Sequence, residues 1–137
     1  MNRKDYINIC IDVAIDFGFK DPENAFWQCN RYSQAVFKVA KILKIKGIKM
    51  FVVDAQWQID SGDAKKGQWF AHVFLKVGNQ NIDFTHRQIK NDTEFPFIFG
   101  KMPSYFKNKK EIFTEIAGEE DYVQAIIKRV MQEEGYL

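Results

Sequence analysis

The chain has 137 residues, the size of one domain with a single hydrophobic core. Apolar residues make up 46% of it and charged residues 28%, a balance that excludes a disordered or fibrous chain. The formal net charge of +2 does not indicate a nucleic-acid or membrane partner. We therefore expect one domain that spans residues 1–137.

Two cysteines, Cys10 and Cys29, are too few for a disulfide framework or a cysteine-based zinc site. We expect free thiols in a reducing compartment, and no metal site. The N-terminus has no apolar signal segment, and no apolar run approaches the roughly 18 residues of a membrane span. These features predict a cytoplasmic protein without a membrane partner. Later delivery by a specialised secretion system would leave no trace in the sequence.

Hydrophobic periodicity predicts three helices. Apolar residues at three- and four-residue steps indicate helices over Asn2–Phe17 and Cys29–Leu43. A third helix is expected over Glu119–Glu134, with acidic residues at its start and basic residues near its end, as the helix dipole favours. The β-branched and aromatic segment Lys49–Ala55 indicates a strand, and the polar segment Ile59–Gly67 indicates a surface loop.

A β-hairpin is predicted over Gln68–Val77 and Gln80–Thr85, joined by a two-residue Gly78-Asn79 turn. The aromatic, proline-broken stretch from Phe95 to Phe106 has no assigned conformation, and we expect it to fill a core rather than wall a groove. Lys107–Lys110 is expected to be a surface loop. Helices at both ends around a central antiparallel sheet give an α+β class.

The predicted turn sets the register of the hairpin. Val77 then pairs with Gln80 and His72 pairs with Thr85. One face of the hairpin is wholly apolar and is expected in the core: Ala71, Val73, Leu75, Val77, Ile82 and Phe84. His72 and Asp83 fall together on the other, mixed face as diagonal neighbours roughly 7–8 Å apart at the backbone. A carboxylate there can hold the imidazole in one tautomer, whereas a three-residue turn would separate the two side chains.

Cys29 completes this pair as a candidate nucleophile. It stands near the start of a predicted helix, where backbone N–H groups and the helix dipole favour a thiolate. It also opens the buried stripe of that helix and is expected to point toward the sheet. Cys29 as nucleophile, His72 as base and Asp83 as orienting acid have the order of a Cys-His-Asp triad.

Three short motifs carry a resemblance to a known family. Gln28-Cys29 before a helix, Ala71–Val77 around His72 and Asn81–Thr85 around Asp83 resemble the papain-like superfamily. Its compact members include transglutaminase-like proteins, arylamine acetyltransferases, peptidoglycan peptidases, and the papain-fold toxins and deamidases of bacteria. The resemblance covers about residues 24–90. It implies a papain-like fold in which N-terminal helices pack on a small central antiparallel sheet, with a C-terminal helix.

The resemblance also implies an oxyanion hole, formed by the backbone N–H of Cys29 and a second donor. Papain-like peptidases often place a glutamine about half a dozen residues before the cysteine, where this chain has Glu23 and Asn24. Asn24, Gln28 or Gln56 remains as the candidate second donor or substrate contact.

These features predict a cysteine-dependent amide hydrolase or acyltransferase: a thiol protease, a glutamine deamidase or a transglutaminase-like enzyme. It would work through a thioester without a metal or organic cofactor, on a protein or peptide-like amide. By analogy, the size fits a bacterial toxin or effector with a cognate inhibitor. One alternative is a catalytically inactive papain-like binding module, motivated by the absent upstream glutamine. A nucleic-acid binder that uses the basic face from Lys38 to Lys49 is less favoured, because no aromatic residues interleave with the lysines.

Four other polar or reactive residues receive simpler interpretations. Cys10 falls on an apolar helical stripe and is expected to be a buried hydrophobic residue. His86 falls on the core face of the hairpin and is expected to be structural. Arg87 and Gln88 either bind substrate or form a polar end of the strand.

Overall fold

The computed structural model describes residues 1–113 and 120–135. In chain order the elements are α1 Arg3–Asp16, α2 Pro22–Ala25, α3 Cys29–Ile42, β1 Ile48–Gln56, β2 Trp69–Val77, β3 Gln80–Asp83, the 3-10 helix η1 His86–Gln88, β4 Phe97–Phe99, β5 Phe106–Ile112 and α4 Glu120–Glu133. The α+β class is confirmed. No helix in the described ranges is long and apolar enough to cross a bilayer.

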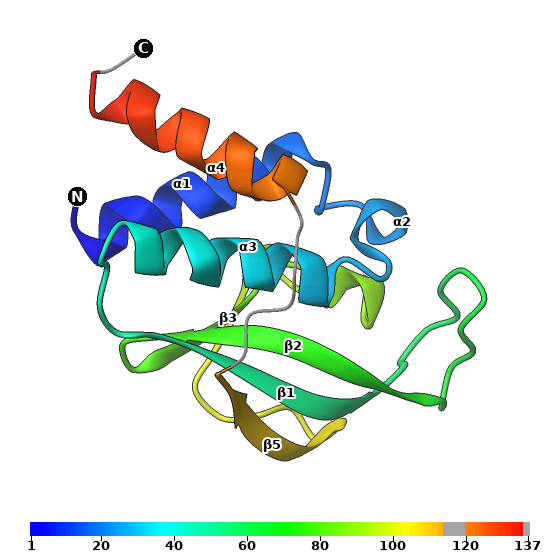
Figure 1. The fold of residues 1–137 in the computed structure, drawn as a ribbon. Coiled ribbons are helices and arrows are strands. Elements are labelled where there is room, and N and C mark those ends of the chain that lie inside the picture. The colour runs from blue at the N-terminus through cyan, green and yellow to red at the C-terminus, as the bar shows by residue number, and fades with distance from the viewer. Residues whose placement is uncertain (114–119, 136–137) are drawn as a thin grey trace.

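The sheet is antiparallel and has five strands in the order β4-β3-β2-β1-β5. Figure 1 shows α3 directly over one face of this sheet, with α1 and α4 on the side of α3 that faces away from the sheet. The core between the helices and the sheet is apolar and includes Tyr6, Val36, Leu75 and Ile126. Burial of these side chains is the main force that holds the helices on the sheet.

A second core lies on the opposite face of the sheet. It includes Phe51, Phe74, Ile89, Phe99 and Phe106, so the aromatic stretch after β3 fills this core, as the sequence analysis expected. The mixed face of the hairpin is therefore covered by protein as well. This covering places the polar side chains of β2 and β3 in buried surroundings.

The predicted hairpin register is confirmed at the turn, where Val77 pairs with Gln80. The expected pairing of His72 with Thr85 is wrong, because β2–β3 pairing ends at Leu75 and Ile82 and β3 ends at Asp83. The Thr85 backbone N–H donates to Oδ1 of Asp83 at 3.1 Å, in a side-chain turn that directs the chain out of the strand and into η1.

Two further expectations are wrong, and one lies outside the described residues. Lys107–Lys110 belongs to β5 and not to a loop; this is an edge strand, so its lysines reach solvent while its backbone pairs with β1. Ala71, expected in the core, is exposed. Helix α4 confirms the C-terminal helix from Glu120 onward, and its expected first residue, Glu119, lies outside the described residues.

Candidate active site

Cys29 is the first residue of α3, and its side chain is 3% exposed. The preceding Gln28 occupies the N-cap position without a side-chain hydrogen bond to the helix. The first N–H groups of a helix have no partner within it, and they carry the positive end of the helix dipole. Cys29 therefore lies at the end of α3 where these backbone N–H groups are available.

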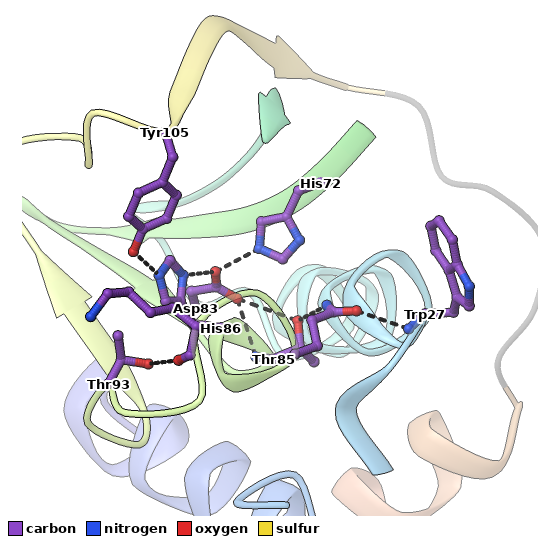
Figure 2. Close-up of polar contacts among 9 residues, drawn as sticks. Trp27, His72, Asp83, Thr85, His86, Thr93 and Tyr105 are labelled. Carbon is purple, nitrogen blue, oxygen red and sulfur yellow. Dashed lines mark hydrogen bonds and ion pairs between the residues drawn. The ribbon is translucent and has the colours of Figure 1, made fainter. Parts of the chain in front are cut away.

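His72 and Asp83 lie in direct contact, as the hairpin register predicted. Nε2 of His72 is 2.5 Å from Oδ2 of Asp83, and both side chains are buried. His72 pairs with Val53 of β1 but lies outside the part of β2 that pairs with β3, which begins at Leu75, and Asp83 is the last residue of β3. The carboxylate thus reaches the imidazole at the point where the two strands diverge (Figure 2).

The electrostatics of this pair favour two charged groups. Burial alone would lower the pKa of His72, but the charge of Asp83 and, after it, that of Cys29 raise this pKa to about 10. Burial alone would raise the pKa of Asp83, but the charge of His72 and hydrogen bonds from His72 and His86 hold it well below its usual range.

The second nitrogen of the His72 ring, Nδ1, is the one available for proton exchange. Nδ1 is buried and has no hydrogen-bond partner among the residues that the structure describes. Because Asp83 occupies Nε2, the ring can exchange a proton with another group only through Nδ1. The influence of the Cys29 thiol on the pKa of His72 makes Cys29 the candidate for that group.

His86 is a second histidine on the same carboxylate. Its Nδ1 lies 2.8 Å from Oδ2 of Asp83, and its Nε2 lies 2.7 Å from the hydroxyl of Tyr105. The ring stacks on Phe97 with centroids 4.0 Å apart. Figure 2 shows His72 and His86 on the two sides of the Asp83 carboxylate. The expectation that His86 lies on the opposite, core face is wrong, because the turn after β3 ends the strand alternation.

A hydrogen-bonded chain links Asp83 to the loop before Cys29. The Thr85 hydroxyl donates to Oδ1 of Asp83 and accepts from Nε2 of Gln88, at 3.4 and 3.1 Å. Oε1 of Gln88 accepts the backbone N–H of Trp27 at 2.9 Å (Figure 2). Trp27 has a φ of 60°, a conformation that is strained for a side chain of this size. Gln88 thus holds a strained residue two positions before the candidate nucleophile.

The three candidate oxyanion donors lie in different places. Gln28 precedes Cys29, and its Oε1 accepts the hydroxyl of Tyr122 at 2.6 Å, which holds the side-chain amide at the start of α3. Asn24 and Gln56 each donate their amide nitrogen to a backbone carbonyl at an exposed position, at 3.2 and 3.1 Å. The amide nitrogen of Gln28 also donates to a backbone carbonyl, that of Phe26 at 3.5 Å, so Gln28 differs from the other two in its place at the start of the Cys29 helix and in the greater length of this contact.

Arg87 and Cys10 have structural contacts. The Arg87 side chain donates to the backbone carbonyls of Thr93 and Lys20, at 2.9 and 3.0 Å, and so ties two loops together. Cys10 is fully buried, as expected, and this burial raises the pKa of its thiol to about 12. Its thiol therefore stays protonated at neutral pH.

One cluster of described residues has ligand atoms that metals bind. The ligand atoms of His72, Asp83 and His86 lie within 4.8 Å of one another. The two nitrogen–oxygen separations of 2.5 and 2.8 Å are hydrogen-bond distances. Ligands of tetrahedral zinc at 2.0–2.1 Å stand roughly 3.3 Å apart. The spacing fits shared protons better than a shared cation.

Comparisons of the chain with protein family models, with curated proteins and with solved structures found no match. Functional inference therefore depends on the residues and geometry described above.

Proposed function

We propose that this chain is a cysteine-dependent amide hydrolase or acyltransferase of the papain-like type, with Cys29, His72 and Asp83 as its triad. One observation carries the proposal: a buried His72 is held by Asp83 through Nε2, its Nδ1 is unpartnered among the described residues, and Cys29 lies buried at the first position of α3. A nucleophile, a base and a group that orients the base are what covalent catalysis by cysteine needs.

The proposed reaction starts from the ion pair that forms when the Cys29 thiol gives its proton to Nδ1 of His72, because the raised pKa of His72 favours the imidazolium. The thiolate attacks the carbonyl carbon of an amide, and the oxygen becomes an oxyanion that the backbone N–H of Cys29 and the Gln28 amide stabilise. The C–N bond then breaks, His72 gives its proton to the leaving amine, and a thioester remains. Water or an acceptor amine attacks the thioester and releases Cys29. Asp83 stabilises the imidazolium in each step.

The substrates proposed are protein or peptide-like amides. Peptide bonds, glutamine side chains and other acyl amides all present the carbonyl and leaving amine that this reaction requires. Peptidase, deamidase and transglutaminase-like activities differ in the leaving group and in the acceptor. A bacterial toxin or effector, restrained by a cognate inhibitor, is the biological setting that we propose by analogy.

Thiol labelling tests the proposal. The folded wild type, Cys29→Ala and Cys10→Ser are reacted with iodoacetamide, and adducts are located by mass spectrometry of peptides. We expect rapid labelling of Cys29 in the wild type and in Cys10→Ser, and none in Cys29→Ala, because the pKa of the Cys10 thiol is raised to about 12 and this thiol stays protonated. His72→Gln is expected to slow labelling of Cys29 at least about tenfold, because the base that forms the thiolate is lost.

Two outcomes would reject the proposal. Labelling that falls on Cys10, or that persists at the wild-type rate in His72→Gln, would mean that the triad does not activate Cys29. A folded protein in which Cys29 resists all labelling would instead favour the inactive binding module, which the low exposure of this side chain also allows.

A further inference from the structure

The three tryptophans of the chain, Trp27, Trp57 and Trp69, line one surface pocket together with Phe70. The volume of the pocket is about 480 Å³, within the roughly 300–1,000 Å³ of small-molecule sites. Trp27 and Trp69 are 50% and 45% exposed, so a ligand can reach their rings. Exposed aromatic surface that is gathered in a hollow is typical of a binding site.

The rings of Trp27, Trp57 and Phe70 pack directly against one another. Trp27 is perpendicular to Trp57, with an interplanar angle of 86°, and to Phe70, with 89°. Trp57 and Phe70 stack almost in parallel, with centroids 4.0 Å apart. These contacts hold Trp27 in place against Trp57 and Phe70 and leave it half exposed, as an aromatic surface that a cation can contact.

The pocket adjoins the candidate active site through the elements that form both. Trp27 stands two residues before Cys29, and Gln88 fixes its strained backbone. Phe70 stands two residues before His72 on β2, and the centroids of these two rings are 5.5 Å apart. The pocket and the candidate active site therefore share the loop before α3 and the first half of β2.

The charge of the pocket favours a cation. Asp63 is the one charged side chain among the described residues that line it, and the neighbouring Lys65 and Lys66 do not line it. An ammonium group already lies on the Trp69 ring, because Nζ of Lys107 is 4.0 Å from its centroid, so a ligand cation would use the exposed Trp27 ring beside Asp63. An aromatic wall with an adjacent carboxylate attracts a cation through both the ring quadrupole and the negative charge.

We propose that this pocket binds the cationic side chain of an arginine or lysine in the substrate, next to the amide that Cys29 attacks. That the ligand is part of a substrate rests on the proposed function, whereas the binding of a cation can be measured without catalysis. It predicts selectivity for substrates with a positive charge near the reacting amide.

The test uses full-length Cys29→Ala, which cannot react. It is titrated with Nα-acetyl-arginine methylamide and with the citrulline analogue, which has nearly the same shape and no charge. The indole N–H signals in a two-dimensional NMR spectrum report directly, because all three tryptophans line the pocket. We expect the arginine compound to shift the Trp27 signal and to bind about tenfold more tightly than the citrulline compound.

Three variants separate charge from shape. Asp63→Asn is expected to weaken arginine binding about threefold to tenfold and to leave citrulline binding unchanged. Glu23→Gln, with the same charge change outside the pocket, is expected to alter neither. Trp27→Gly accepts the positive φ of this position, so it is expected to fold and to lose the preference for arginine.

Equal affinity for the two compounds, or no shift of any indole signal, would overturn the pocket proposal. The two proposals fail separately. Arginine binding without labelling of Cys29 in the wild type would reject the enzyme proposal alone. Labelling of Cys29 without arginine binding would reject the cation pocket alone.

Discussion

Asp83 receives hydrogen bonds on both of its carboxylate oxygens. Oδ2 accepts from the two histidines, His72 and His86, and Oδ1 accepts from the backbone and hydroxyl of Thr85. Donors to the charged form of a carboxyl group favour that form, and this offsets the cost of burying the charge. The fold therefore keeps one buried anion in place, and this anion stabilises a protonated His72.

This arrangement predicts a pH dependence of stability. The pKa of His72 is raised from 6.5 to about 10, so its contribution is complete below pH 6.5 and is lost as pH rises toward 10. The pKa of Asp83 is lowered from 3.8, so its contribution is present above pH 3.8 and is lost as pH falls below that value. We expect the free energy of unfolding to be highest between these limits and to fall from pH 6.5 to 9.

Urea unfolding at several pH values between 5 and 9 would measure this decline. Asp83→Asn is the matched variant, because it removes the negative charge with little change in shape. We expect it to be less stable at pH 6 and to lose most of the decline above pH 6.5. An equally steep decline in Asp83→Asn would mean that groups other than this pair control the pH dependence.

The contact of His72 with Asp83 follows from the sequence, whereas the place of His86 does not. A two-residue turn fixes which side chains share a face for as long as side chains alternate along the strand. This alternation ends at Asp83, where the side chain of Asp83 accepts the N–H of Thr85 and bends the backbone. His86 then falls beside Asp83 because of that turn. The sequence signal for this turn was an aspartate at the end of a short strand, with a threonine two residues later and a histidine three residues later.

At the level of elements, α4 supports the start of α3 across the chain. The Tyr122 hydroxyl donates to Oε1 of Gln28 at 2.6 Å, and this bond orients the Gln28 amide beside Cys29. If that amide stabilises an oxyanion, its removal weakens the binding of reagents that form a tetrahedral adduct and leaves the rate of simple alkylation unchanged. A peptidyl aldehyde forms such an adduct with a thiolate, whereas iodoacetamide does not.

We therefore expect Gln28→Ala to bind a peptidyl aldehyde about 100-fold more weakly and to react with iodoacetamide at nearly the wild-type rate. Tyr122→Phe is expected to have a smaller effect in the same direction, because the amide remains but loses its orientation. Gln56→Ala is the control, since the Gln56 amide donates to the carbonyl of Gly67. Loss of aldehyde affinity in Gln56→Ala, with none in Gln28→Ala, would assign the donor differently.

Hydrophobic periodicity predicted the long helices, but it missed a strand that forms by pairing with a distant segment. Helices α1 and α3 bury apolar residues at three- and four-residue steps, and their bounds agree with prediction to within one residue. Three of the seven residues of strand β5 are lysines, so its composition suggested a loop. It is a strand because β1 offers an unpaired edge more than fifty residues earlier in the chain, and a single segment does not reveal such a partner.

At the scale of the whole molecule, the sheet separates two cores with different tasks. The helices cover one face, and residues after β3 cover the other, where His72, Asp83 and His86 lie among aromatic rings. The sequence predicted the apolar face, because it alternates strictly. It did not predict that the mixed face would be equally buried, since its cover comes from a stretch without regular periodicity. The candidate triad owes its burial to this second core.

Two isoleucines allow a matched test of that division. Ile126 lies in the core between helices and sheet, and Ile89 lies in the second core directly after η1; both are 0% exposed. Truncation of either to alanine leaves a cavity and is expected to cost about 2–5 kcal/mol of unfolding free energy. The Ile89 N–H donates to the carbonyl of His86 at 2.9 Å, so a cavity at Ile89 loosens the turn that carries His86 and Gln88.

The rate of iodoacetamide labelling of Cys29 should distinguish these variants well below their melting temperatures. We expect Ile126→Ala to react at nearly the wild-type rate, because its cavity lies among the helices. Ile89→Ala should react at least about threefold more slowly, because His86 and Gln88 position Asp83 and the loop before Cys29. Thermal melts would verify that the two proteins are similarly destabilised. Equal labelling rates at equal stability would mean that the second core holds the fold without tuning the site.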